Sequence, residues 1–224
     1  MPYRLHFAPD NASLCIRLAL ESLGISFETV LVDRATQAQK SAAFLALNPN
    51  GLLPVLETPD GPIYETAAIL LWLADRAGAL MPAPDDPARG AALTWLFWLS
   101  NTLHVAERVL FYPEKYIVAP QSETLRAATR QTIAAHLDLL NAANPGWLRS
   151  PSIHACYLAP LLRWPALYGG DPAWYDLRKW PSLLAFARTY ETTAPALKAA
   201  KAEGLGPTPF SAPTMPDPPQ GSAT

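Results

Sequence analysis

Two short segments of the chain combine residues that can bind a small charged molecule, and the first is Leu53-Pro54. This dipeptide follows the turn-forming residues 48–51 and opens a strand-like run. A cis bond before the proline turns the backbone N–H and C=O of Leu53 outward, where a ligand can reach them. The alternative is an ordinary trans proline at a strand start. Spacing alone favours that alternative, because only about 5–6% of X-Pro bonds are cis.

The second segment is Glu65-Thr66, which stands directly before a helical run. Thr66 is at or near the helix N-cap, where free backbone amides and the helix dipole favour an anion such as a carboxylate. Glu65 can accept a hydrogen bond from an ammonium group, so the pair can hold both charges of an α-amino acid. The alternative is a capping pair that binds no ligand, and spacing alone favours it.

The elements that must position these segments follow from periodicity and turn chemistry. Strand-like runs are rich in β-formers, helical runs repeat apolar residues every three or four positions, and glycines stand where helices end. The predicted order is βαβαββα: strand 3–7, helix 13–23, strand 27–32, helix 42–47, strands 53–57 and 62–64 of a hairpin, and helix 66–76.

The remainder of the chain has no alternating strand pattern. Residues 81–87 hold three prolines and two aspartates, which places a domain boundary there. The sequence therefore predicts an α/β domain over residues 1–80 and an all-α domain over residues 88–204. Its helices are predicted at 88–110, 122–140, 153–162 and 183–192. The last segment, 205–224, contains six prolines and little apolar surface, so we predict a disordered tail or one draped over the surface.

Composition narrows the class of partner. Seventeen basic and nineteen acidic residues give a formal charge of -2, which argues against nucleic-acid binding by phosphate neutralisation. Even the longest apolar run, which contains 67–73, is far shorter than the roughly 20 residues of a membrane span. The two cysteines have no metal-binding spacing. We therefore expect a soluble cytoplasmic protein without a metal, whose partners are small neutral or dipolar molecules.

Taken together, these features resemble a cytosolic glutathione transferase. The resemblance covers residues 3–198 and is carried by the element order, the segments 48–56 and 64–70, the proline-rich linker and the helical remainder. Residues 152–164 are similar to the sixth helix of bacterial beta-class members. The resemblance implies a thioredoxin-like domain that binds glutathione, a helical domain that forms the wall of an electrophile pocket, and a homodimer.

The resemblance also implies roles for individual residues. Leu53, with Pro54 cis, would offer its backbone to the cysteinyl part of glutathione. Glu65 and Thr66 would hold the γ-glutamyl end, and Asn50 stands just before this loop.

A transferase must lower the pKa of the glutathione thiol, because the thiolate is the nucleophile and a free thiol has a pKa near 8.5. Here the chain departs from the family. Phe7 stands where a tyrosine is often found, and Ala12 where the beta class has its cysteine. The remaining catalytic candidates are Ser13, which we place first, and Asn11. Ser13 as a plain N-cap is an equal alternative. Cys15, inside an apolar helix, is more consistent with inert packing.

The electrophile pocket is assigned to His104, Trp98 and Tyr112. His104 matches in position a histidine that lines the cleft of some beta-class members, although a lone helical histidine is more often structural. Aromatic residues at helical spacing are also more often core. The predicted function is conjugation of the glutathione thiolate to a small hydrophobic electrophile. The alternative is a non-catalytic glutathione-binding or scaffold protein, and a thiol-disulfide oxidoreductase would require a reactive cysteine.

Overall fold

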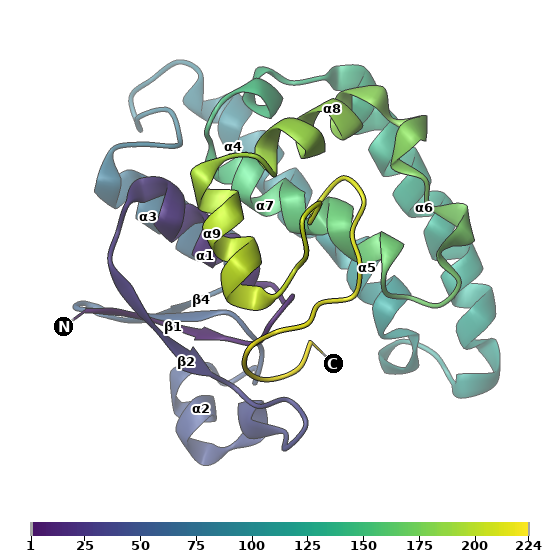
Figure 1. Ribbon diagram of the computed structural model, residues 1–224, viewed down its shortest axis with the longest axis horizontal. Coiled ribbons are helices and arrows are strands. Elements are labelled where there is room, and N and C mark those ends of the chain that lie inside the picture. The colour runs from purple at the N-terminus through teal and green to yellow at the C-terminus, as the bar shows by residue number, and fades with distance from the viewer. Residues whose placement is uncertain (1, 224) are drawn as a thin grey trace.

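The computed structural model describes residues 2–223, and their first third forms a four-stranded mixed sheet with helices on its faces (Figure 1). The strand order is β2-β1-β3-β4, with β1 parallel to β2 and the other pairs antiparallel. This arrangement is the predicted thioredoxin-like βαβαββα unit. The elements are β1 (Tyr3–Phe7), α1 (Ser13–Leu23), β2 (Phe27–Leu31), α2 (Ala42–Leu47), β3 (Val55–Thr58), β4 (Gly61–Tyr64) and α3 (Thr66–Ala77).

Helix α1 is the central element of this unit. Its apolar side chains recur at helical spacing and are buried from Ser13 to Leu20, where the helix packs against α3 and two helices of the second half. Gly24 ends α1 at φ 65°, a left-handed conformation that favours glycine, and its amide returns to the carbonyl of Leu20. The buried packing of α1 holds its first residues beside the loop that follows β1.

The second half is all-helical, as the sequence predicts. The predicted helix over residues 88–110 is continuous but contains a π-helical turn at its centre, which alters the face that the following residues present. One helix, α9, was not predicted. The elements are α4 (Arg89–Trp98), the π turn (Leu99–Leu103), α5 (His104–Phe111), α6 (Ser122–Ala143), α7 (Ile153–Arg163), α8 (Pro181–Tyr190) and α9 (Ala194–Glu203).

Helix α7 lies at the centre of the whole molecule, and every one of its residues is buried. Its first turn is capped by the Ser152 hydroxyl, which accepts a hydrogen bond from the amide of Ala155 at 3.1 Å. Its last residue, Arg163, is fully buried and pairs with Asp10 of the loop after β1 at 2.8 Å. A charge at this depth is tolerated because it is paired and hydrogen-bonded.

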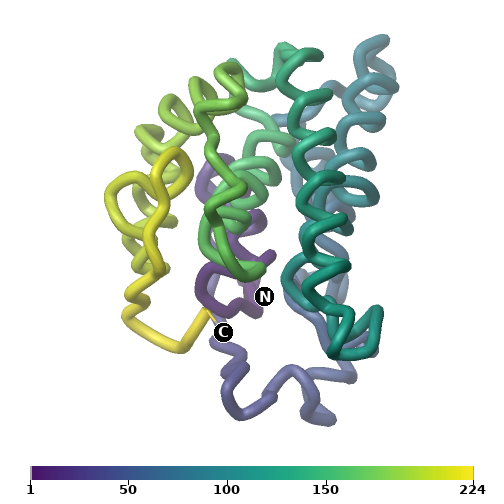
Figure 2. Tube along the Cα trace, turned by 90° about the vertical axis from the view of Figure 1, so that its right-hand side faces the viewer, coloured from purple at the N-terminus to yellow at the C-terminus, as the bar shows by residue number. Residues whose placement is uncertain are grey.

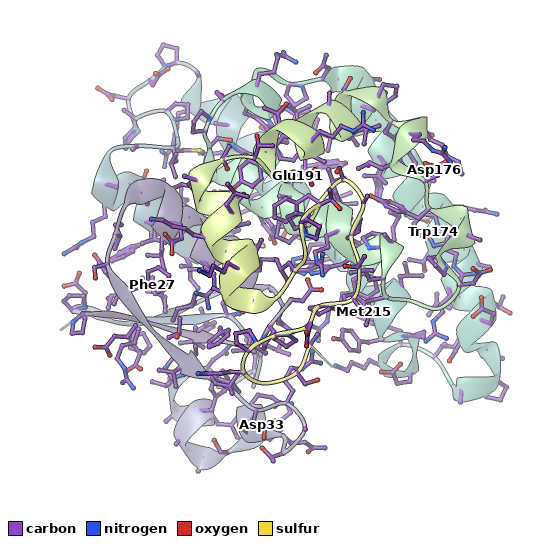
Figure 3. The ribbon with its side chains drawn as sticks, in the orientation of Figure 1. Phe27, Asp33, Trp174, Asp176, Glu191 and Met215 are labelled. Atoms are coloured by element: carbon purple, nitrogen blue, oxygen red, sulfur yellow. The ribbon has the colours of Figure 1, made fainter. Side chains whose placement is uncertain are left out.

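The C-terminal tail is draped over the body and is not disordered, so the disordered alternative for residues 205–224 is wrong over its described part. Figure 2 shows the tail in yellow, returning from α9 toward the N-terminal sheet. The guanidinium of Arg163 donates to three of its carbonyls. The Glu191 carboxylate accepts from the amides of Phe210 and Ser211, and Figure 3 labels Glu191 on the body and Met215 on the tail. The tail has few apolar side chains, but three charged side chains of the body, Arg34, Arg163 and Glu191, bind its backbone, and composition does not reveal such bonds.

Within residues 2–223, no helix combines the length and the apolar character needed to cross a membrane.

We expect Arg163→Met to lower the free energy of unfolding by about 3–5 kcal/mol, because it leaves the buried Asp10 carboxylate without its cationic partner. Urea denaturation measures this change. Arg178→Gln is the matched control, because it removes an arginine from the exposed pair with Asp176 and should leave the denaturation midpoint unchanged. Equal stability of the two variants would contradict a supporting role for the buried pair.

Candidate functional site

A cavity of about 470 Å³ lies between the sheet half and the helical half. Its sheet side comes from the loops after β1 and β2 and from the turn before β3. Its helical side comes from α5, the short 3-10 helix after α5, and the segment that follows α7. The residues that line it are Asp10, Asn11, Ala12, Arg34, Gln39, Lys40, Gly51, Leu52, Leu53, His104, Arg108, Phe111, Tyr112, Lys115, Trp164, Leu167, Tyr168, Gly169 and Ala223.

Asp10 fixes the loop that follows β1 in this cavity wall. Its carboxylate accepts hydrogen bonds from the Arg163 guanidinium at 2.8 Å, the Trp164 indole at 2.9 Å and the Tyr168 hydroxyl at 2.7 Å. Its amide donates to the buried Glu203 carboxylate at 2.8 Å. The φ of Asp10 is 51°, a strained value for a non-glycine residue that these four contacts hold in place. The loop is therefore rigid, and the negative charge of Asp10 is neutralised.

The two candidate thiol activators lie in different places. Ser13 is fully buried, its hydroxyl donates to the carbonyl of Ala8 at 3.1 Å, and it does not line the cavity. Asn11 does line the cavity. Its side-chain oxygen accepts from the amide of Ala12 at 2.9 Å, which leaves its NH2 group without a partner among residues 2–223. Asn11 therefore faces the cavity, whereas the Ser13 hydroxyl is engaged in a buried hydrogen bond within the protein.

Neither Phe7 nor Cys15 offers a reactive group to the cavity. Phe7 is buried in β1 beneath the Arg17 guanidinium, whose carbon lies 4.9 Å from the ring centroid. Cys15 is fully buried, and burial raises the pKa of its thiol well above the ordinary value. An inert packing role for Cys15 fits this placement.

The Leu53–Pro54 bond is cis, so the trans alternative does not apply. Leu53 lines the cavity, and its amide and carbonyl make no hydrogen bond to any residue in the described part of the chain. Strands β3 and β4 pair with Val55 opposite Tyr64. Continuing this antiparallel register by one residue places Pro54 beside Glu65. The two segments that the sequence singled out are therefore neighbours.

Glu65 and Thr66 stand at the start of α3, next to the cavity but not on its wall. Glu65 is exposed, does not cap the helix and has φ 73°, a strained conformation for a non-glycine residue. The first-turn amides of α3 consequently lack a side-chain cap. An exposed carboxylate beside an uncapped helix start suits a ligand that carries both an ammonium and a carboxylate.

Two predicted site residues are absent from the cavity wall. Asn50 is exposed in the turn before Leu53, where its amide donates to the Asn48 side chain at 3.0 Å. Trp98 packs edge-on against Trp95 and His136. The π-helical turn Leu99–Leu103 separates it from His104, and His104 lines the cavity whereas Trp98 does not. The structure therefore does not bring Trp98 to the pocket assigned to it.

His104 and Tyr112 do line the cavity, and His104 is electrically neutral there. Its Nδ1 lies 2.9 Å from the Tyr157 hydroxyl, and its ring packs against Trp164 at 5.7 Å between centroids. Burial, with a smaller contribution from the Arg108 charge, lowers the pKa of His104 to about 4. His104 is therefore a weak base, suited to shaping the cavity rather than accepting a proton at neutral pH.

Sequence reasoning missed the basic residues of the cavity. Four cations line it, from both sides: Arg34, Lys40, Arg108 and Lys115. One signal was available, since Arg108 lies four residues after His104 and so shares its helix face. No group of three or more candidate metal ligands occurs in residues 2–223.

We expect His104 to stay neutral from pH 8 down to about pH 5. Its folded pKa of about 4 lies below the free imidazole value of 6.5, so the unfolded chain binds the proton first as the pH falls. His104 thus causes no loss of stability above pH 6.5 and a progressive loss between about pH 6.5 and 4. NMR titration of its ring protons, assigned with His104→Gln, measures the pKa. A midpoint above about pH 5.5 would contradict this expectation.

Comparison with known proteins agrees with this geometry. The family model for the N-terminal domain of glutathione S-transferase matches residues 12–76. Glutathione S-transferase GstB of Escherichia coli K12 is 38% identical over 96 residues, which are 42% of this chain and 46% of GstB, so the match spans about half of that relative. Glutathione S-transferase GST-4.5 of Xanthomonas campestris is 29% identical over 214 residues, 90% of this chain and 99% of that protein.

Solved structures match over nearly the whole chain. A sphingomonad glutathione S-transferase complexed with glutathione is 32% identical, with a TM-score of 0.75 over 91% of this chain and 100% of that one. The beta-class transferase of Sphingomonas chungbukensis is 29% identical, with a TM-score of 0.76 and the same coverage. With the cis proline loop and the start of α3 side by side on a thioredoxin-like sheet, the chain belongs to the glutathione S-transferase family and is similar to its bacterial beta-class members.

Proposed function

We propose that the protein binds glutathione at the sheet side of the cavity and transfers its thiolate to a small hydrophobic electrophile. The observation that carries this proposal is the adjacency of the Leu53 backbone and the start of α3. A solved relative at 32% identity holds glutathione in its structure. Fold alone does not fix function, so the proposal rests on the site.

Each part of glutathione has a matching group. The free backbone of Leu53 pairs with the cysteinyl peptide, as neighbouring strands pair. Glu65 accepts from the γ-glutamyl ammonium, and the amides at Thr66 bind its carboxylate. Lys40 supplies a positive charge for the glycyl carboxylate. Its Nζ lies beside Gly51, only 2.9 Å from where a β-carbon there would stand.

Asn11 is our candidate for the group that stabilises the glutathione thiolate. Its unpartnered NH2 group lies in the cavity at the N-terminal end of α1, where the helix dipole also favours an anion. A donor and a positive potential at the sulfur lower the thiol pKa. Ser13 supports the same loop from inside the protein, because its hydroxyl donates a hydrogen bond to the carbonyl of Ala8. The sulfur then forms a bond to the electrophilic carbon, and the leaving group departs with its bonding electrons.

The alternative is a protein that binds glutathione without activating it. Phe7 and Ala12 supply neither a hydroxyl nor a thiol, and this observation favours the alternative. The oxidoreductase reading loses support, because Cys15 is fully buried with a raised thiol pKa.

A homodimer belongs to the proposal as well. Phe97 of α4 and Val105 of α5 are each about half exposed, at 49% and 48%, and we place the subunit contact on these two helices. Light scattering coupled to size-exclusion chromatography determines the oligomeric state.

We expect Glu65→Ala to abolish retention of the protein on glutathione-agarose, because it removes the acceptor for the γ-glutamyl ammonium. Removing a charged hydrogen-bond partner reduces affinity by roughly ten- to a hundredfold. Glu28→Ala, which removes an exposed carboxylate from β2, is the control and should be retained. Retention of both variants would remove the γ-glutamyl site from the proposal.

We also expect Asn11→Ala to raise the thiol pKa of bound glutathione by about 1–2 units, because the thiolate then loses one hydrogen bond. The ultraviolet absorption of the thiolate, followed against pH, reports this pKa. Ser13→Ala should leave it unchanged while lowering thermal stability, because its hydroxyl bonds to Ala8. The reverse pattern would assign activation to Ser13, and an ordinary pKa in the wild type would favour the non-catalytic alternative.

A further inference from the structure

We propose that the second substrate is an aromatic electrophile that carries a carboxylate, and that Arg108 binds this carboxylate with support from Lys115. This inference rests on the proposed function and specifies the substrate class for the helical side of the same cavity.

Arg108 is the first observation. It is half-buried on α5 and lines the cavity, yet its guanidinium makes no hydrogen bond or ion pair with any of residues 2–223. Only its backbone carbonyl is engaged, by the amide of Tyr112. A guanidinium offers five donors and no acceptor, and its planar fork matches a carboxylate. A half-buried and unpartnered guanidinium therefore favours an anionic ligand.

Lys115 lines the helical side of the cavity, as Arg108 does. Its Nζ stands 4.3 Å from the centroid of the Tyr112 ring and has no carboxylate partner in the described part of the chain. Arg34, by contrast, is already engaged by the carbonyl of Ala223 and the hydroxyl of Tyr112. The free cations of the helical side are thus Arg108 and Lys115.

The charge balance of the cavity exceeds what glutathione needs. Among residues 2–223, four cations line it, and the single acid of its wall, Asp10, is neutralised by the buried Arg163. Glutathione as a thiolate carries two carboxylates, one ammonium and the thiolate, and so has two negative charges in sum. The Glu65 carboxylate, which is assigned to the ammonium, adds a third negative charge, so one of the four positive charges remains unmatched when glutathione is bound. Because Lys40 and Arg34 lie on the sheet side with Leu53, the unmatched positive charge lies on the helical side, with Arg108 and Lys115.

The walls around Arg108 suit a flat ring. Phe111 and Tyr168 meet edge-on with 6.1 Å between centroids, and Tyr112 and Trp164 complete an aromatic lining. Aromatic faces favour offset or edge-on packing with a substrate ring. Trp164 and Tyr168 also donate to Asp10, the chain neighbour of Asn11, so a ring held among these side chains lies beside the place assigned to the glutathione sulfur.

The corresponding reaction is balanced without a further reactant. With 4-chloro-3-nitrobenzoate as the probe, the thiolate sulfur forms a bond to the ring carbon that carries chlorine. The carbon–chlorine bond breaks, and chloride leaves with the bonding electrons. The thiol proton passes to solvent, and the carboxylate is unchanged throughout.

The test compares 4-chloro-3-nitrobenzoate with 4-chloro-3-nitrobenzamide, its neutral counterpart of similar shape. For each, kcat/KM is divided by the rate constant of the uncatalysed reaction with glutathione. We expect this ratio to be higher for the benzoate. Arg108→Gln should lower it roughly ten- to a hundredfold for the benzoate and less than about threefold for the benzamide. Arg108→Lys should restore part of the loss, because it keeps the charge but not the fork.

Arg188→Gln is the charge-matched control. It removes a positive charge from an exposed position on α8, outside the cavity, and should leave both ratios unchanged. An equal loss for benzoate and benzamide in Arg108→Gln would overturn the inference. It would also be overturned if that variant mainly raised the KM for glutathione, since Arg108 would then bind the tripeptide.

Binding measurements separate failure of this inference from failure of the proposed function. Calorimetry with 4-methyl-3-nitrobenzoate and its amide, which cannot react, measures the charge preference without turnover. Preference for the benzoate that disappears in Arg108→Gln supports the inference, and equal binding of both compounds overturns it. Retention on glutathione-agarose reports on the proposed function independently.

Discussion

The buried ion pair between Arg163 and Asp10 is the interaction on which the site depends. It joins the end of the central helix α7 to the loop after β1, and the same guanidinium binds three carbonyls of the C-terminal tail. Desolvating two charges is expensive, and here it is offset because the polar atoms of both groups are satisfied. The carboxylate receives two further hydrogen bonds, from Trp164 and Tyr168.

This pair has two consequences for the cavity. It fixes the backbone of Asp10 at a positive φ, so that Asn11 and Ala12 face the space where a thiol would lie. It also cancels the charge of Asp10, the one acidic residue that the described part of the chain contributes to the cavity wall, which leaves the field of the surrounding basic residues unopposed. A positive and partly desolvated cavity stabilises a thiolate, and it also accepts an anionic second substrate. The same ion pair therefore positions the Asn11 loop and makes the electrostatic potential of the cavity positive.

The tail extends the same network to the far side of the molecule. Its amides at Phe210 and Ser211 are bound by Glu191, and its described end reaches the cavity, where the carbonyl of Ala223 accepts from Arg34. Arg34 also donates to the Tyr112 hydroxyl, so one side chain links the sheet half, the helical half and the tail. The cavity is thus enclosed by three regions that are distant in sequence.

The sequence by itself determined the order of the elements and the segments of the proposed glutathione cradle. Turn residues 48–51, Gly24 and Gly78 act through local backbone preferences, and apolar periodicity lies within one helix or strand. Both signals are local, so they can be recognised without knowing the tertiary structure. The expectation of a cis Leu53–Pro54 bond and the role proposed for Glu65 required the family resemblance as well. Tertiary structure alone decided that Asn11 faces the cavity while Ser13 is buried, that Trp98 packs elsewhere, that the tail is ordered and that unpaired cations line the helical side. Each of these depends on contacts between residues far apart in the chain, such as Asp10 and Arg163, and no local pattern encodes them.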